Sequence, residues 1–162
     1  MAIPPLPGVH RDRAAPPLHH LWRLMRLRAE AAIAPMDLRL RHVVALSVLR
    51  RSGGATQQAL AEMLRIDRTN LVGLLNELEA RGLVLRMRDA GDRRRHNVEL
   101  TPAGAVRLDE AEALLAGVED DVLGALDADE RRTLCALLQK ATGGCAPALV
   151  AASGDEELVA AS

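Results

Sequence analysis

Aromatic side chains are almost absent from this chain of 162 residues. It contains no tyrosine and no phenylalanine, and Trp22 is its single tryptophan, although 49% of its residues are apolar. The core must therefore be built from aliphatic residues, of which there are enough for one compact domain. Proteins that hold single-stranded nucleic acid stack its bases on several aromatic rings, so this function class is nearly excluded.

Cysteines and long apolar runs are scarce as well. Cys135 and Cys145 are too few for a disulfide scaffold and form no CxxC pair, and the five histidines show no HxxxH spacing. No run of about 18 apolar residues could span a bilayer, and prolines interrupt the N-terminal segment where a secretory signal would be apolar. We expect a cytoplasmic protein with no membrane partner, no metal site and no cofactor.

The net charge of −1 conceals an uneven distribution. Residues 1–36 carry a net charge of +3, residues 37–107 carry thirteen arginines against eight acids, and residues 108–162 carry −9. A basic middle and an acidic C-terminal part fit a polyanion-binding face on an acidic support. Ordinary solvated helix faces would produce similar numbers, so charge alone leaves both interpretations open.

Apolar spacing and capping residues predict a series of helices. The first begins after Pro17, and the second runs from about Asp37 or Leu38 to Arg51, where Gly53 or Gly54 closes it. The third, "QQALAEML", follows Thr56 as N-cap. The fourth, "RTNLVGLLNELEARG", follows Asp67 as N-cap and ends at Gly82. The short third helix and the turn after it indicate a helix-turn-helix.

The fourth helix has the pattern of a recognition helix. Its four leucines lie on one stripe at 100° per residue, while Thr69, Gly73 and Asn76 point away from that stripe. Apart from Arg68, the outward N-terminal half is small, polar and uncharged. Such a surface can enter a major groove and read base edges, with asparagine favouring adenine. A surface helix with few charges is the alternative.

The stretch "RMRDAGDRRRHNVELT" predicts a hairpin with a basic tip. Leu83, Leu85 and Met87 alternate with polar or smaller residues before the turn, and residues 96–100 alternate after it, so both strands should be half buried. A helix-turn-helix followed by such a hairpin is a winged helix. Arginines at the tip could reach phosphate or the narrow minor groove, and Asp92 could hold Arg94 in one bidentate geometry.

The ordered series of turn, recognition helix, "ELEARGLV", DRR wing and "LTPAG" resembles the MarR family of bacterial winged-helix transcription regulators over roughly residues 18–142. The resemblance implies a triangular homodimer whose first and last two helices interlock, each winged helix reading half of a pseudo-palindrome. Position 73 is often arginine in relatives, so Gly73 removes a guanine reader. The expected DNA-binding residues are Thr56, Gln57, Arg68, Thr69, Asn70, Val72, Gly73, Asn76, Asp92, Arg93, Arg94 and Arg95.

Two terminal helices fit a dimer independently of the resemblance. Thr101 precedes Pro102 as N-cap of a helix through "AGAVRLDEAEALLAGVEDDVLGAL", and Asp127 with Glu130 starts another that ends at Gly143. We expect a mainly α fold with a small β-wing. Its parts are a disordered N-terminal segment (1–17), a dimerisation helix (18–36), the winged helix-turn-helix (37–101), long dimerisation helices (102–142) and a flexible C-terminal tail (143–162).

The residues also bear on the signal that such a regulator would sense. The family resemblance implies an aromatic or phenolic effector, and Trp22, His19 and His42 could line its pocket together with His20. A satisfied core or surface histidine is the alternative for His42. Cys135 lies on the last helix and nothing predicts a lowered pKa for it, so a redox switch is a weaker hypothesis.

These observations favour a DNA-binding regulator, expected to be a ligand-responsive repressor that acts as a homodimer on a pseudo-palindromic operator. No nucleophile with a positioned base and no paired carboxylates are evident, so we expect no catalytic residues. Two alternatives stay open: a winged helix that binds protein without an operator of its own, and a cysteine-based redox-sensing regulator.

Overall fold

A computed structural model describes residues 13–88 and 96–143. The fold is mainly α with a small β-wing, as predicted, and the wing strands belong to a three-stranded antiparallel sheet. The elements are α1 (Ala15–Ile33), a 3-10 turn η1 (Ala34–Met36), α2 (Leu40–Ser52), β1 (Ala55–Thr56), α3 (Gln57–Leu64), α4 (Arg68–Ala80), β2 (Val84–Arg88), β3 (His96–Leu100), α5 (Pro102–Val122) and α6 (Ala128–Ala141).

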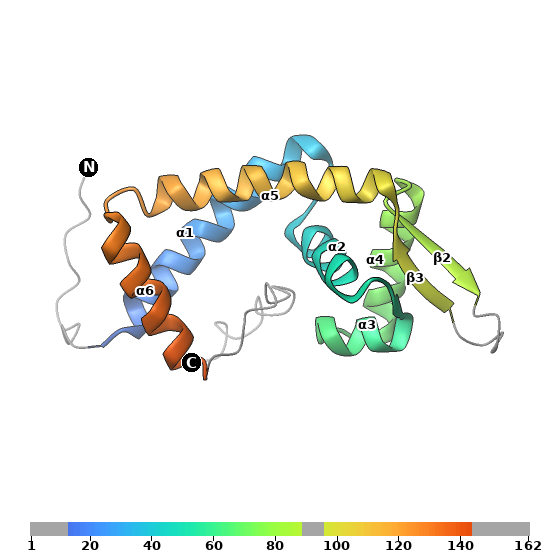
Figure 1. Ribbon diagram of the computed structural model, residues 1–162, viewed down its shortest axis with the longest axis horizontal. Coiled ribbons are helices and arrows are strands. Elements are labelled where there is room, and N and C mark those ends of the chain that lie inside the picture. Colours follow the sequence, from blue (N-terminus) through green and yellow to red (C-terminus); the bar gives the residue numbers. More distant parts are fainter. Residues whose placement is uncertain (1–12, 89–95, 144–162) are drawn as a thin grey trace, which may run out of the picture.

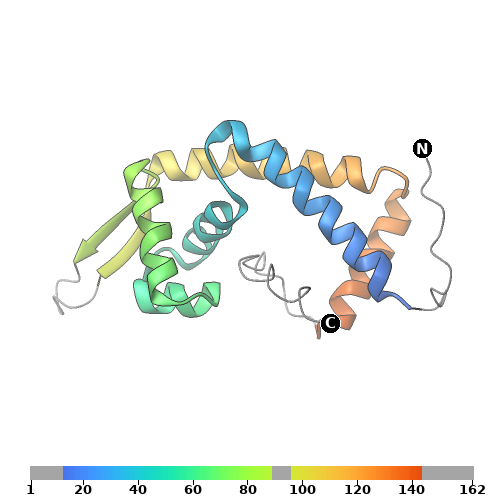
Figure 2. The ribbon, with the colours of Figure 1, turned by 180° about the vertical axis from the view of Figure 1, so that it is seen from behind.

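The long helix α5 joins two ends of the molecule (Figure 1). One end holds α2, α3, α4 and the sheet, and the other holds α6 and the N-terminal part of α1. Figure 2 shows the same division from behind, with α1 crossing α5 diagonally. The sheet that could contact nucleic acid thus lies at the opposite end from the terminal helix α6.

Helix boundaries follow the predicted caps. The side chains of Thr56, Asp67 and Thr101 accept hydrogen bonds from backbone N–H groups three residues later, at 2.9–3.1 Å. Asp127 and Glu130 form the predicted capping box at the start of α6. These side chains satisfy backbone donors that a helix leaves unpaired in its first turn. The glycines predicted to end helices, Gly53, Gly82 and Gly143 among them, all have positive φ.

Three predicted helix limits were wrong by a few residues. Helix α1 begins at Ala15 because prolines fit the first turn, where no N–H is needed. Helix α2 begins at Leu40, since Asp37 has a left-handed φ of 55° that interrupts a helix. Helix α5 ends at Val122 rather than Leu126.

The sheet has the order β1-β3-β2, with Ala55 opposite Val98 and Arg86 opposite Val98 on the other side. The two-residue strand β1 was not predicted. The prediction for β2 was also wrong about its faces: Val84 is buried, while Leu85 and Met87 are 50% and 40% exposed. The alternation was ambiguous because both faces of β2 carry apolar side chains. Arg86 lies on the same face as the buried Val84, and its hydrogen bonds to Asn76 and Glu79 satisfy its guanidinium there.

The buried core lies at the sheet end of the molecule. It combines the predicted leucine stripe of α4 with residues of α2, α3, the sheet and α5; its largest buried members include Leu46, Leu49, Leu60, Leu71, Leu75, Leu78, Val98 and Leu108. By contrast, none of the described residues of α6 is buried. Within the described part of the chain, no helix combines the length and apolar character needed to cross a membrane.

The start of α5 is joined to the turn between α4 and β2 by close backbone contact. Thr101 donates its hydroxyl hydrogen to the Gly82 carbonyl at 2.7 Å and its N–H to the Leu83 carbonyl at 3.1 Å. A Cβ on Gly104 would lie 2.1 Å from the Leu83 carbonyl oxygen, far inside van der Waals contact. Glycine at this position therefore allows α5 to pack directly on the turn.

A second connection between α5 and the core is ionic. The Arg50 guanidinium on α2 donates to both Glu112 carboxylate oxygens at 2.5 and 2.6 Å and to Asp109 at 2.8 Å. Hydrogen bonding to Arg50 lowers the pKa of Glu112, and Ser47 donates to the same carboxylate. Helix α5 is thereby held to α2 as well as to the turn after α4.

Candidate nucleic-acid interface

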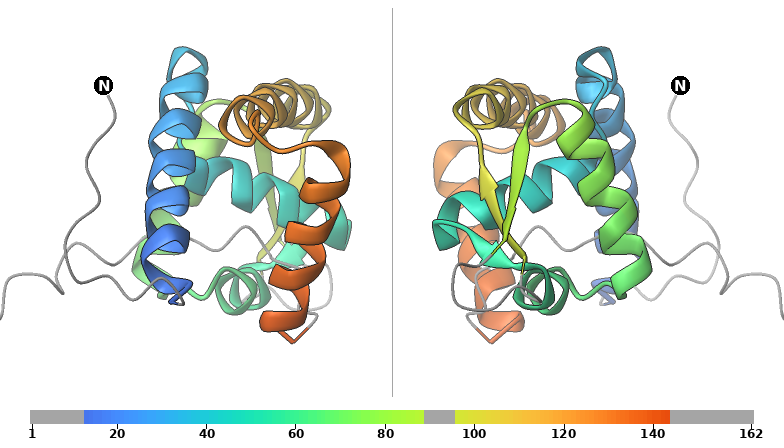
Figure 3. Two further views of the ribbon diagram at one scale, coloured as in Figure 1. Left: turned by 90° about the vertical axis from the view of Figure 1, so that its left-hand side faces the viewer. Right: turned by 90° about the vertical axis from the view of Figure 1, so that its right-hand side faces the viewer.

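A three-residue turn sets the angle between α3 and α4. Arg65 has a left-handed φ of 53°, and the N–H of Ile66 donates to the Ala61 carbonyl at 3.1 Å. Asp67 then caps α4. Figure 3 shows α4 beside the hairpin at the same end of the molecule, with α3 crossing near its start. This is the arrangement predicted for a helix-turn-helix with a wing.

The outward face of α4 presents the residues predicted to read DNA. Arg68, Thr69, Asn70, Gly73 and Asn76 are exposed. Thr69, Gly73 and Asn76 lie opposite the buried leucines, and Asn70 lies on one flank. No described atom lies within 4 Å of the place where a Cβ on Gly73 would stand. The middle of this face is therefore open, as the insertion of a helix into a groove requires.

Three further predicted positions lie at the margin of that face. Val72 is half buried on the flank of α4. Thr56 and Gln57 are half buried at the start of α3, where the Thr56 hydroxyl oxygen caps the helix by accepting from the Ala59 N–H at 3.1 Å. The tip residues Asp92, Arg93, Arg94 and Arg95 lie outside the described residues, so their predicted contacts stay predictions.

Neighbouring side chains hold both outward asparagines. The carboxylate of Asp67 accepts from the backbone N–H of Asn70 and from its side-chain amide. The Asn76 side-chain oxygen accepts from the guanidinium of Arg86 at 2.5 Å, and Glu79 accepts from the same guanidinium at 2.5 and 2.9 Å. The backbone hydrogen bond from Asn70 lowers the pKa of Asp67, and the bond from Arg86 lowers the pKa of Glu79. Sequence spacing gave no sign of this role for Arg86.

Glu77 ties the other flank of α4 to α2. Its carboxylate accepts from Arg41 at 2.5 Å and from Nε2 of His42 at 2.8 Å. Burial favours a raised pKa for Glu77, but the hydrogen bonds from Arg41 and His42 outweigh it and leave that pKa lowered. Helices α4 and α2 are thus coupled by a charged network.

His42 is 1% exposed, and both of its ring nitrogens have partners. The Arg39 N–H donates to Nδ1 at 3.1 Å, so the neutral ring carries its proton on Nε2 and donates it to Glu77. Desolvation by burial lowers the pKa of His42. His42 is therefore the satisfied core histidine that was the alternative to a ligand-binding role, although one edge of its ring also lines a cavity.

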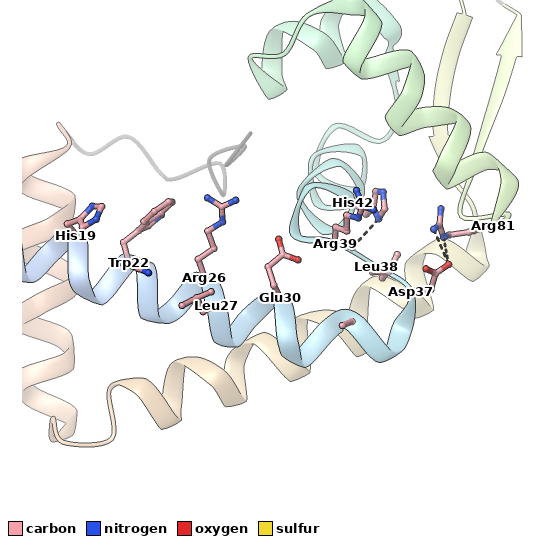
Figure 4. A pocket seen from close by; sticks show the side chains of 12 residues that line it. His19, Trp22, Arg26, Leu27, Glu30, Asp37, Leu38, Arg39, His42 and Arg81 are labelled. Atoms are coloured by element: carbon pink, nitrogen blue, oxygen red, sulfur yellow. Dashed lines mark hydrogen bonds and ion pairs between the residues drawn. The ribbon is translucent and has the colours of Figure 1, made fainter. Parts of the chain in front are cut away.

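That cavity lies between α1, the start of α2 and the end of α4, and has a volume of about 900 Å³. It brings together the predicted residues His19, Trp22 and His42, but His20 is not among its lining residues. Figure 4 shows His19, Trp22 and Arg26 projecting from the same side of α1. The full lining is His19, Trp22, Arg23, Arg26, Leu27, Glu30, Ala34, Asp37, Leu38, Arg39, His42 and Arg81.

The charge of this cavity was not predicted. Four of its lining residues are arginines, and only Glu30 and Asp37 are acids. The guanidinium of Arg26 lies 5.4 Å from the centre of the Trp22 ring, and Arg81 pairs with Asp37 at 3.0 Å. An indole face beside an excess of guanidinium groups suits an aromatic anion.

Cys135 is exposed on α6, at the opposite end from the sheet. Across residues 13–88 and 96–143, no group of three or more histidine, cysteine or acidic side chains is placed to hold a metal ion.

Comparison with known proteins identifies relatives of the DNA-binding region. Residues 38–96 match the model of the MarR family. The chain is 35% identical over 95 residues to a transcriptional regulatory protein for the hcr operon of Thauera aromatica, and 36% identical over 97 residues to the HTH-type transcriptional repressor NicR of Pseudomonas putida. These matches cover 59% and 60% of this chain, and they span only about three fifths of the relatives' own length, 57% and 61%.

The fold has solved counterparts. A crystal structure of a point mutant of MarR from E. coli in complex with operator DNA is similar with a TM-score of 0.68 and 25% identity, covering 78% of this chain and 91% of that one. The structural likeness covers 78% of this chain, which is more than the winged helix alone and more than the 59% and 60% covered by the two sequence matches.

Proposed function

We propose that the chain is a member of the MarR family and a transcription regulator that binds double-stranded DNA as a homodimer. The observation that carries the proposal is the outward face of α4: five exposed residues on a capped helix, open at Gly73 and backed by a buried leucine stripe. Such a face fits the major groove, which admits one helix and displays a distinct donor and acceptor pattern for each base pair.

The homodimer is supported by apolar surface far from the sheet. None of the described residues of α6 is buried, and Leu137 on this helix is 60% exposed, while Leu18 and Trp22 on α1 are also exposed. A second copy would cover these side chains through a twofold contact. The two winged helices of such a dimer (residues 37–101 of each copy, here called the reading heads) would bind half-sites about one helical turn, or 34 Å, apart. Within this proposal, residues 18–36 and 102–142 are the dimerisation helices.

The cavity supports a small-molecule effector. Its arginines and Trp22 suit an aromatic anion, which includes phenolic acids. The lining residues come from α1 and α2 as well as from Arg81 at the end of α4, so a bound ligand would bias the position of the recognition helix relative to the dimer helices. The protein would then be a ligand-responsive repressor in the cytoplasm, released from its operator when the spacing of its heads changes.

One observation favours a second candidate, a winged helix that binds protein. Leu85 and Met87 form an exposed apolar pair on the outer face of β2, which phosphate contact would not require. The basic tip predicted at residues 92–95 argues for DNA. Replacing Arg94 with alanine separates the two, because loss of a phosphate or minor-groove contact weakens DNA binding and lessens its salt dependence.

Selection of sheared genomic DNA on the purified protein tests the function at about 0.15 M salt, where non-specific binding is much reduced. We expect enrichment of a pseudo-palindrome with half-sites about 10 base pairs apart. A folded dimer that enriches no sequence over the input would overturn the proposal and leave the protein-binding candidate.

A further inference from the structure

The recognition helix carries two asparagines on its exposed face, Asn70 and Asn76, and the chemistry of their neighbours determines how each amide is turned. An asparagine side chain has one acceptor oxygen and one donor NH₂ group. Where the neighbour can only donate or only accept, the orientation of the amide follows from hydrogen-bond chemistry.

Asn76 faces a group that only donates. The Arg86 guanidinium has five N–H donors and no acceptor, so the amide atom 2.5 Å from it must be the oxygen. Glu79 binds the same guanidinium through two further hydrogen bonds and fixes it in place. The NH₂ group of Asn76 is therefore the end left to face outward.

Asn70 faces a group that only accepts. The Asp67 carboxylate receives the backbone N–H of Asn70 on one oxygen and its side-chain NH₂ on the other. An ionised carboxylate has no hydrogen to donate. The oxygen of Asn70 is therefore the end left to face outward, opposite in polarity to Asn76.

We propose that α4 reads DNA with this pair of fixed amides: Asn70 accepts from an amino base, adenine or cytosine, and Asn76 donates to a keto base, guanine or thymine. In the major groove, adenine and cytosine present amino hydrogens, whereas guanine O6 and thymine O4 are acceptors. A freely rotating asparagine reads adenine with both amide atoms at once. The hydrogen bonds to Asp67 and Arg86 fix how each amide is turned, so we expect the outward end to make the base contact and the preference to differ from that of a freely rotating asparagine.

The spacing of the two amides also predicts how far apart the two bases should lie in a half-site. They are six positions apart, which is about 9 Å along the helix axis and about 120° around it, so they lie on either side of Gly73. The axial distance compares with the rise of two to three base pairs at about 3.4 Å each. Gly73 lies midway on the same face, with no described atom within 4 Å of its Cβ position. We expect an amino base and a keto base two or three pairs apart in each half-site, without a protein side chain between them.

This inference rests on the proposed function, and selection from a library of random duplexes tests it. The wild-type protein, Asn70→Ala and Asn76→Ala are compared first, to find the position that each asparagine reads. We expect a preference of roughly five- to tenfold for amino bases at the Asn70 position and for keto bases at the Asn76 position, each lost in its alanine variant.

Two further variants release the amides without removing them. Arg86→Met takes away the donor beside Asn76, so preference at that position should move toward adenine. Asp67→Ser keeps an N-cap residue but removes the second oxygen that holds Asn70, so that position should accept adenine more strongly than cytosine. Thermal melting and gel filtration establish that each variant is a folded dimer.

Asn76→Asp gives the sharpest result if Arg86→Met fails to fold. An aspartate retains the pairing with Arg86 but turns an acceptor outward, so the selected base should change from keto to amino. Selection of adenine or cytosine by the wild-type protein at the Asn76 position would overturn the inference. So would an Asn76→Ala variant that loses affinity equally for all sequences, because Asn76 would then contact phosphate. Failure of the proposed function looks different: the wild-type protein would enrich nothing.

Discussion

The two ends of the molecule differ in how they cover their apolar side chains. At the sheet end, Leu71, Leu75 and Leu78 of α4 are buried against α2, α3 and α5. At the other end, no described residue of α6 is buried and Leu137 is 60% exposed. The reading head at the sheet end thus has a hydrophobic core of its own, whereas the described residues around α6 form no buried core.

This difference separates two properties of the protein. The reading head is stabilised by contacts within one chain, so its stability should not depend on protein concentration. In the proposed dimer the terminal helices would gain their burial from a second copy, so a fixed distance between two heads would exist only where the dimer is populated. Helix α5 connects the two ends: Gly104 packs on the turn after α4, and Arg50 of α2 pairs with acids of α5. We expect these two contacts to determine how rigidly the reading head is held relative to the dimerisation helices.

The largest effect is expected from closing the space at Gly104. Gly104→Ala places a Cβ 2.1 Å from the Leu83 carbonyl oxygen and 2.8 Å from the Leu100 side chain, so backbone must move. We expect a loss of about 3 kcal/mol in the free energy of unfolding, measured by urea denaturation. Gly117→Ala, at a position in the same helix with no described atom within 4 Å, is the control and should be neutral or slightly stabilising. Equal effects of both variants would show that the close approach is not what Gly104 permits.

A charge on α6 should weaken the proposed dimer without unfolding the reading head. Leu137→Asp puts a carboxylate into the surface that the second copy would cover, and we expect the dissociation constant to rise by roughly a hundredfold, or about 2.7 kcal/mol. Sedimentation velocity measures it, and Gln139→Asp, about 200° around the helix, is the matched control. A dimer unchanged by Leu137→Asp would mean that α6 does not form the interface.

Removing the ionic joint should have a smaller effect. Arg50→Met breaks the pairs with Glu112 and Asp109, but the Arg50 side chain is 40% exposed and solvent screens it. We expect a loss of about 1 kcal/mol or less in unfolding free energy, diminishing at high salt. Denaturation in low and high salt measures this loss, with Arg51→Met, its exposed neighbour, as the reference. A loss independent of salt would indicate lost packing of the side-chain stem instead.

The smallest expected effect concerns the pH dependence of the stability of the sheet end, where His42 is buried. Burial lowers the pKa of His42 in the folded state, so the unfolded chain binds more protons than the folded one as the pH falls below the ordinary value of 6.5. His42 therefore contributes stability that is present above pH 6.5 and is lost as the pH falls through its lowered pKa. Between pH 7.5 and 5.5 we expect the wild-type protein to lose more unfolding free energy than His42→Gln. Parallel curves would show that His42 does not titrate on unfolding in this range.

Local chemistry explains which parts of this structure could be predicted. A side chain such as Asp67 or Thr101 caps the helix that follows it, and Gly82 adopts a conformation other residues avoid, so the sequence around each reveals its role. The leucine stripe of α4 follows from the period of the helix alone.

What escaped prediction depends on residues far apart in the chain. Arg86 meets Asn76 ten positions earlier, and Asp37 pairs with Arg81 across 44 positions. Neither the helix period nor a capping residue predicts such long-range pairs. The same is true of the arginines that line the cavity. The inward face of β2 escaped because Leu85 and Met87 are as apolar as a core requires, although they lie outside it.

The open space at Gly73 would make the proposed regulator easy to direct to new DNA targets. Every glycine codon becomes an arginine codon by a change of its first base, and the Cβ of an arginine at position 73 would have open space around it. A guanine-reading group could therefore be added to the centre of the recognition helix in one mutational step while the fold stays intact. A duplicated copy of the gene could in this way acquire a separate set of targets before any other part of the protein changes.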